Sequence, residues 1–101
     1  MTYKEMNQIC KDNNVYGTQF YIAEEMECQL YEEEQANPSN ERFEHLCEYA
    51  YWLYLKSENL SIASICRALG ELEVEFETVE TAKDPLEMDK WAILDLAAMK
   101  E

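Results

Sequence analysis

The chain has 101 residues, of which 22 are acidic and eight are basic, so its formal net charge at pH 7 is −14. A small domain needs a net charge of only roughly 2–8 for solubility, and a larger negative field repels nucleic acid and anionic membranes. Hydrophobic residues make up 48% of the chain, with only two Gly and two Pro, which excludes a disordered tail and a turn-rich sandwich. We expect one acidic domain over 1–101, mainly α, a compact bundle of four or five helices.

The first half of the chain predicts two helices. The pattern "TYKE" places Thr2 and Glu5 as a capping box, which predicts a short helix that ends near Asp12. After "NNVYG", Thr18 caps a second predicted helix that runs to about Gln35, before the loop "ANPSN". Its apolar side chains recur at three- and four-residue steps at Phe20, Ala23, Met26 and Leu30.

The second half predicts three more helices. The segment from Asn40 to Ser57 is apolar nearly all round at "YAYWLYL" (49–55), so we place this helix at the centre of the bundle. A fourth helix begins near Ser61. In "DPLE", Asp84 as N-cap and Pro85 as first helical residue predict the last helix.

The stretch "LGELEVEFETVE" (69–80) allows two structures. If the fourth helix continues, its apolar residues from Ile62 to Val79 follow a seven-residue repeat, with Glu71 and Glu77 the most exposed acids. If Gly70 ends the helix, the strict alternation predicts a short β-strand or hairpin near 71–79. Glutamates 71, 73, 75 and 77 would then form one exposed row. We favour the helix.

The segment "LSIASICRALG" (60–70) resembles the first helix and turn of a helix-turn-helix unit. The residues at the position of that family's recognition helix, "ELEVEFETVE", include no Lys or Arg and would be repelled by phosphates. The resemblance therefore implies a fold with lost or inverted charge, and direct binding of nucleic acid is not expected.

The residues of common active sites are missing from the sequence. His45 is the only histidine, and Cys47 lies two positions away, where side chains on a helix do not face each other. There is no Gly-rich phosphate loop, no G-x-S-x-G and no H-E-x-x-H. The four cysteines are 18, 19 and 19 residues apart without a C-x-x-C pair, which favours free, largely buried thiols over a zinc site. We expect no enzyme, no metal and no cofactor.

The longest wholly apolar run has seven residues, whereas a membrane-spanning helix needs about 20. The opening residues "MTYKEMNQICKDNN" are polar and do not resemble a signal peptide. We therefore expect a cytoplasmic protein without membrane contact.

The acidic residues are segregated from the basic ones. No base lies between Lys11 and Arg42, where six acids fall within 24–34, and none lies between Arg67 and Lys83, where there are five acids. Such segments forgo the Glu–Lys pairs that stabilise an exposed helix by roughly 0.2–0.5 kcal/mol each. The segregation favours a surface used in recognition.

Two functions follow as hypotheses. The first is a nucleic-acid mimic that blocks the basic groove of a DNA- or RNA-handling protein. In size, acidity and fold class the chain is similar to small phage-encoded inhibitors of restriction or CRISPR nucleases, although no motif is shared. The expected contact residues are Glu24, Glu25, Glu27, Glu32, Glu33, Glu34, Glu71, Glu73, Glu75 and Glu77. The alternative is a helical adaptor or self-associating subunit, with a homodimer allowed, that uses the apolar segment 49–55.

Overall fold

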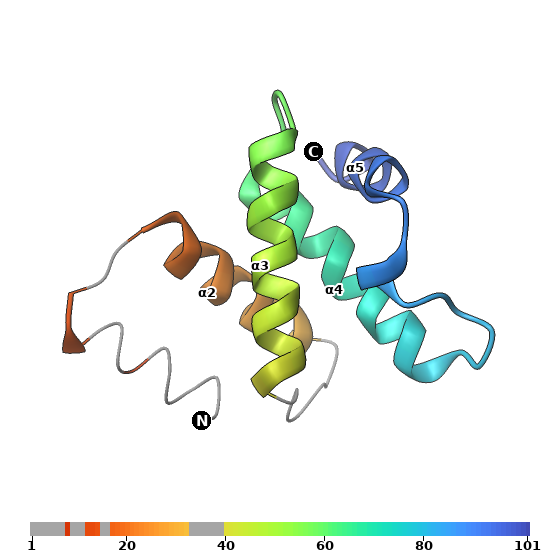
Figure 1. The fold of residues 1–101 in the computed structure, drawn as a ribbon, viewed down its shortest axis with the longest axis horizontal. Helices are drawn as coiled ribbons and strands as arrows, with labels where there is room; N and C mark the ends of the chain where they lie inside the picture. The colour runs from red at the N-terminus through yellow and green to blue at the C-terminus, as the bar shows by residue number, and fades with distance from the viewer. Residues whose placement is uncertain (1–7, 9–11, 15–16, 33–39) are drawn as a thin grey trace.

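The computed structural model describes residues 8, 12–14, 17–32 and 40–101. These residues form four α-helices and one 3₁₀ turn, without a strand (Figure 1). The elements are α2 (Thr18–Glu32), α3 (Asn40–Lys56), α4 (Ile62–Thr78), η1 (Pro85–Glu87) and α5 (Lys90–Met99). The predicted helical bundle is confirmed, and the alternative of a strand or hairpin near 71–79 is wrong. The helix predicted for 2–12 lies almost wholly outside the described residues.

Helix α4 is the central element of the bundle. It packs against α2, α3, α5 and η1, and Figure 1 shows α3 crossing in front of α2 while α5 lies beyond α4. The prediction that α3 lies at the centre is therefore wrong. Only one side of α3 is buried, through residues such as Ala50 and Leu53, whereas Trp52 and Leu55 are 39% and 59% exposed. The buried core comprises Ile22, Ala23, Met26, Leu30, Phe43, Leu46, Ala50, Leu53, Ile65, Cys66, Ala68, Leu69, Ile93, Leu94 and Ala97.

Helix α4 continues through Gly70 because its partner α2 lies very close there. The helix begins after Ser61, whose side chain accepts a hydrogen bond from the backbone N–H of Ser64. A Cβ atom built on Gly70 would lie 2.8 Å from Cβ of Gln29 on α2. The glycine thus permits close approach of two helices and does not end one. The turn expected from the helix-turn-helix resemblance is not formed.

The last helix begins later than predicted. Asp84 accepts a hydrogen bond from the N–H of Leu86 at 3.0 Å, as expected for a cap, but the turn it starts ends after three residues. The backbone of Met88, which follows this turn, is extended and separates the turn from α5. The carbonyl of Met88 accepts a hydrogen bond from the hydroxyl of Tyr49 and so connects this extended residue to α3. Asp89 then caps α5 by accepting from the N–H of Trp91. None of the described helices is long and apolar enough to cross a membrane.

Candidate binding surfaces

The glutamates expected on α2 are divided between described and undescribed parts of the chain. Glu24, Glu25 and Glu27 lie on α2 and are half-buried. Glu32 is the last residue of the helix, and the structure describes its backbone only. The predicted contacts at 33 and 34 lie outside the described residues. The structure therefore places three of the predicted α2 carboxylates at the surface.

The four glutamates expected on 71–77 do not form one row, because they are spread around a helix. Glu71 and Glu75 are exposed and lie one turn apart on the outer side of α4. Oε2 of Glu71 lies 2.8 Å from Nζ of Lys100, which follows α5. Glu77 is exposed elsewhere on the helix, next to Glu73.

The prediction that Glu73 contacts a partner is wrong, because its side chain is only 3% exposed. On a helix, Glu73 lies four residues after Leu69 and three before Phe76, which places it on the side that faces the core. A carboxylate in such a position requires a cation or several hydrogen-bond donors. Arg42 on α3 supplies them.

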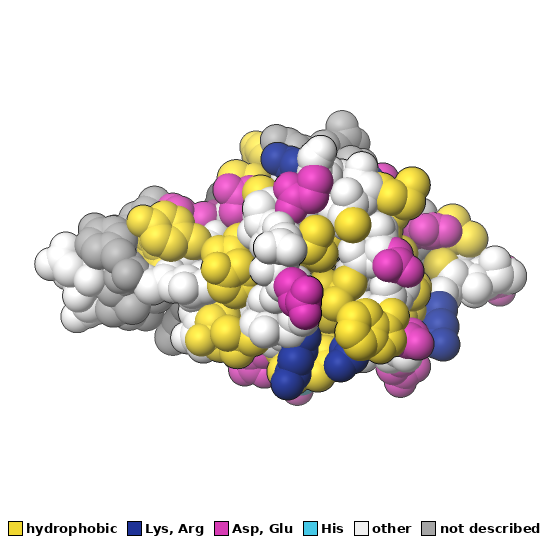
Figure 2. All heavy atoms as spheres, turned by 90° about the horizontal axis from the view of Figure 1, so that it is seen from above, with side chains coloured by type: hydrophobic (Ala, Val, Ile, Leu, Met, Phe, Trp, Pro, Cys, Tyr) yellow, Lys and Arg dark blue, Asp and Glu magenta, His cyan; other side chains and the backbone are white. Residues whose placement is uncertain are grey.

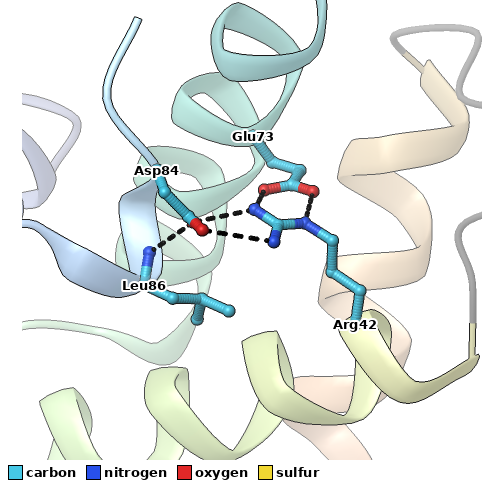
Figure 3. A network of polar contacts seen from close by, with 4 residues as sticks. All are labelled: Arg42, Glu73, Asp84 and Leu86. Carbon is cyan, nitrogen blue, oxygen red and sulfur yellow. Dashed lines mark hydrogen bonds and ion pairs between the residues drawn. The ribbon is translucent and has the colours of Figure 1, made fainter.

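Arg42 connects three elements of the fold (Figure 3). Its Nε and Nη2 donate to the two carboxylate oxygens of Glu73, with Nη2 at 2.7 Å from Oε2. The same Nη2 lies 2.8 Å from Oδ1 of Asp84, at the start of η1. The guanidinium also lies over the ring of Phe76, 4.9 Å from its centroid. A single side chain thereby joins α3, α4 and η1.

The charges of this network perturb one another. Hydrogen bonds to Glu73, and then to Asp84, raise the pKa of Arg42, so the guanidinium is always charged. The hydrogen bond from Arg42 lowers the pKa of Asp84. Burial and the neighbouring charge of Glu73 raise the pKa of Glu77, against the opposing effect of Arg42. The contacts of Arg42 with Glu73 and Asp84 are directed inward, so we assign these three residues to stability and not to binding.

Other basic residues of the described chain are also engaged. Lys100 pairs with Glu71, and Nη1 of Arg67 donates to the Lys100 carbonyl at 3.5 Å. Lys56 and Lys90 lie over aromatic rings. Among the residues that the structure describes, no ion pair involves the carboxylates of Glu24, Glu25, Glu41, Glu44 and Glu48. The side chains of Glu41, Glu44 and Glu48 are exposed, and those of Glu24 and Glu25 are half-buried.

The outer stripe of α3 changes character along the helix. Its N-terminal half exposes three carboxylates and one imidazole, those of Glu41, Glu44, His45 and Glu48. Its C-terminal half exposes Trp52, Leu55 and Lys56 instead. This division was not predicted, because 49–55 reads as one apolar segment in the sequence. The three- and four-residue steps from position 41 to 55 were the signal that would have revealed it.

Aromatic rings and ammonium groups gather at the C-terminal end of this stripe. The rings of Tyr49 and Trp52 stack with centroids 5.8 Å apart. Nζ of Lys56 and Nζ of Lys90 lie 5.8 Å and 5.2 Å from the centroid of Trp52, and Lys90 also lies 4.9 Å from that of Trp91. We call these five residues the aromatic–lysine cluster. On the face drawn in Figure 2, Lys or Arg side chains lie beside apolar groups at the lower edge, and acidic side chains are scattered over the whole face, including that edge.

A hollow lies between α2 and α3. It has a volume of about 230 Å³ and is lined by Gln19, Ala23, Glu44, Cys47 and Glu48. Burial raises the pKa of the Cys47 thiol far above its usual range, which disfavours the nucleophilic thiolate there. Within the described ranges, no group of three His, Cys, Asp or Glu side chains is arranged to hold a metal ion.

The described cysteines differ in exposure. Cys66 is buried, Cys47 is half-buried and Cys28 is exposed. The expectation of largely buried thiols thus fits the first two and not Cys28. Cys10 lies outside the described residues.

No family model matches the sequence, and comparisons with curated proteins and with solved structures found no match. The function is therefore inferred from the surface chemistry of this chain alone.

Proposed function

We propose that this protein is a non-enzymatic binding protein whose acidic surface occupies a basic surface of a partner. The partner class that fits best is a DNA- or RNA-handling protein, whose phosphate-binding groove the acidic protein would block as a nucleic-acid mimic. The observation that carries the proposal is the net charge of −14, combined with the carboxylates of Glu24, Glu25 and Glu75, which take part in no ion pair among the described residues.

The physical argument is one of complementarity and rate. Acidic side chains without local cations create a field that extends about 8 Å into a solution of physiological salt. Such a field accelerates association with a basic surface and disfavours partners of like charge. A fold selected for stability alone would gain from Glu–Lys pairs on its exposed helices. The segregation of charge therefore supports recognition.

The structure narrows the residues on which the proposal rests. Glu73 is excluded because it is buried against Arg42. The proposed contact residues are those with exposed or half-exposed side chains on the two helices that carry the predicted acids: Glu24, Glu25 and Glu27 on α2, and Glu71, Glu75 and Glu77 on α4. We call these six residues the acidic surface.

A second candidate function is a helical adaptor that binds through the aromatic–lysine cluster. The observation in its favour is the exposure of large apolar side chains at one end of α3 and the start of α5. Leu55 and Trp91 are each 59% exposed, and Trp52 is 39% exposed. Aromatic residues of this kind are enriched where proteins contact one another.

A salt gradient and competition by double-stranded DNA distinguish the two functions. The protein is immobilised, incubated at low salt with a lysate of the organism that carries it, and eluted with a rising salt gradient. The proposal predicts that basic nucleic-acid-binding proteins elute well below about 1 M salt, where the screening length falls to about 3 Å. It also predicts that excess double-stranded DNA displaces them at low salt. A partner that resists both treatments would contradict the mimic and support the adaptor.

A further inference from the structure

The outer stripe of α3 carries charges of opposite sign at its two ends. Glu41, Glu44 and Glu48 occupy its N-terminal half, and all three are exposed. The C-terminal half carries Lys56. Lys90 of α5 adds a second positive charge there, because both ammonium groups lie over the ring of Trp52. The negative and positive halves are about 22 Å apart at their extremes, from the helical rise over 15 residues.

We propose that two copies of this chain pair through this stripe, with the two α3 helices antiparallel. In that arrangement the acidic half of each copy lies against the aromatic–lysine cluster of the other. Glu41 of one copy faces Lys56 of its partner, and His45 faces Trp52. The two-fold axis passes between positions 48 and 49, so that Glu48 faces Tyr49 and not a second Glu48.

Charge complementarity selects this orientation. A parallel pairing would place Glu41 beside Glu41 and Lys56 beside Lys56, and like charges in contact are destabilising. In the antiparallel pairing every favourable contact is made twice, as a two-fold symmetric interface requires. The contact would also remove Trp52 and Leu55 from water, and tryptophan is among the residues that contribute most to protein interfaces.

The inference is independent of the proposed function, because it uses α3 and the start of α5. The acidic surface lies on α2 and α4. Failure of the dimer would leave the mimic untouched, whereas a dimer would cover the aromatic–lysine cluster and so compete with an adaptor that binds its partner there.

Charge reversal tests the antiparallel register directly. Variant A carries Glu41→Lys and Glu44→Lys, so both ends of the stripe are positive. Variant B carries Lys56→Glu and Lys90→Glu, so both ends are negative. All four side chains lie at or near the surface, and circular dichroism checks that each variant is folded. The mass of each species is measured by analytical ultracentrifugation at physiological ionic strength, where the 11.9 kDa chain and its dimer are well separated.

The proposal predicts a dimer for the wild type, monomers for A and for B, and a restored dimer in an equimolar mixture of A and B. The result for A separates specific contacts from the effect of net charge. A has a smaller net negative charge than the wild type, so if repulsion between whole molecules alone controlled association, A would associate more readily than the wild type. A wild-type monomer at high micromolar concentration would overturn the proposal. So would dimers of A alone and B alone, since another surface would then be responsible.

The double variant Trp52→Ala and Leu55→Ala serves if a charge variant does not fold. Both side chains are substantially exposed, so the fold is expected to survive their loss while the dimer dissociates. A dimer of unchanged affinity in a folded double variant would also overturn the proposal.

Discussion

The carboxylate of Glu73 accepts two hydrogen bonds from the guanidinium of Arg42, although 31 positions separate the two residues. The Glu73 side chain is 3% exposed and that of Arg42 is 26% exposed. Since Arg42 also pairs with Asp84, this contact fixes α3, α4 and η1 relative to one another. Arg42, one of the few basic residues in a strongly acidic chain, is therefore part of the fold.

Removing the cation from this network should be strongly destabilising. Arg42→Met leaves the buried carboxylate of Glu73 without its partner, and breaking a buried pair in this way costs about 3–5 kcal/mol. The partial exposure of Arg42 places the expected loss at the lower end. The double variant Arg42→Met and Glu73→Leu should recover part of it, because no unpaired charge remains. Urea unfolding followed by circular dichroism measures both, and equal losses in the single and double variants would contradict this account.

Glu77→Gln should stabilise the protein at neutral pH. The pKa of Glu77 is raised in the folded state, so the folded state binds a proton more tightly than the unfolded chain does. The contribution of Glu77 to stability is therefore complete below the unfolded pKa and is lost as the pH rises through the folded pKa. The variant should gain about 0.5 kcal/mol or less at pH 7, since solvent screens this exposed group, and nothing at pH 3. Urea midpoints at the two pH values test the sign.

Asp84 should give a dependence on pH of the opposite sign. Its pKa is lowered by the hydrogen bond from Arg42, so its stabilising contribution is present above the ordinary carboxyl pKa of about 3.9 and is lost as the pH falls through the folded value. Asp84→Asn keeps a side-chain oxygen for the N–H of Leu86 and removes the charge. We expect the variant to lose less stability than the wild type between about pH 5 and pH 2. Identical slopes in acid would contradict the assignment.

Gly70→Ala should destabilise the fold in spite of the better helix propensity of alanine. The propensity gain is about 1 kcal/mol, but the new Cβ would lie 2.8 Å from Cβ of Gln29, an atom attached directly to the backbone of α2. Overpacking of this kind costs about 1–3 kcal/mol. Gly17→Ala, just before α2, is the control for a methyl group added without a clash, because no described residue beyond its chain neighbours has an atom within 4 Å of a Cβ there. A melting temperature raised by Gly70→Ala would show that α2 and α4 do not approach so closely.

The thiol of Cys66 should react only when the protein opens. It is fully buried, and burial raises its pKa to about 12. In a chain whose other cysteines are replaced by serine, a disulfide reagent should modify Cys66 at the rate of unfolding. The control replaces Cys66 by alanine and introduces Glu80→Cys at an exposed position, where modification should be immediate. Equal rates in the two proteins would contradict the buried position.

Local patterns predicted most of the helices because each pattern reflects a local physical cause. The apolar stripe of α2 and the start of α4 near Ser61 depend only on residues a few positions apart, and both are observed. Helix α5 begins later than predicted because two aspartates five residues apart, Asp84 and Asp89, both act as caps. The first begins only a single 3₁₀ turn, and the second begins α5. Choosing between them requires the contact from Tyr49, which is distant in sequence.

The proposed acidic surface was harder to predict than the fold. Whether Glu73 faces a partner or the core depends on its pairing with Arg42. The sequence within a few residues of Glu73 does not predict that pairing. The helical pattern held a partial signal, since Glu73 falls between Leu69 and Phe76 on the apolar side. The central position of α4 likewise depends on Gly70 and Gln29, which meet only after the helices pack.

We propose that particular acidic side chains mediate binding, and not the total charge alone. A test variant carries Gln in place of Glu24, Glu25, Glu71 and Glu75. A control variant loses the same number of charges at other exposed acids, through Glu58→Gln, Glu80→Gln, Glu87→Gln and Asp95→Asn. Capture of basic nucleic-acid-binding proteins from lysate at low salt is measured for both variants and for the wild type. We predict that the test variant loses capture and that the control retains it, whereas equal capture by the two variants would contradict the claim.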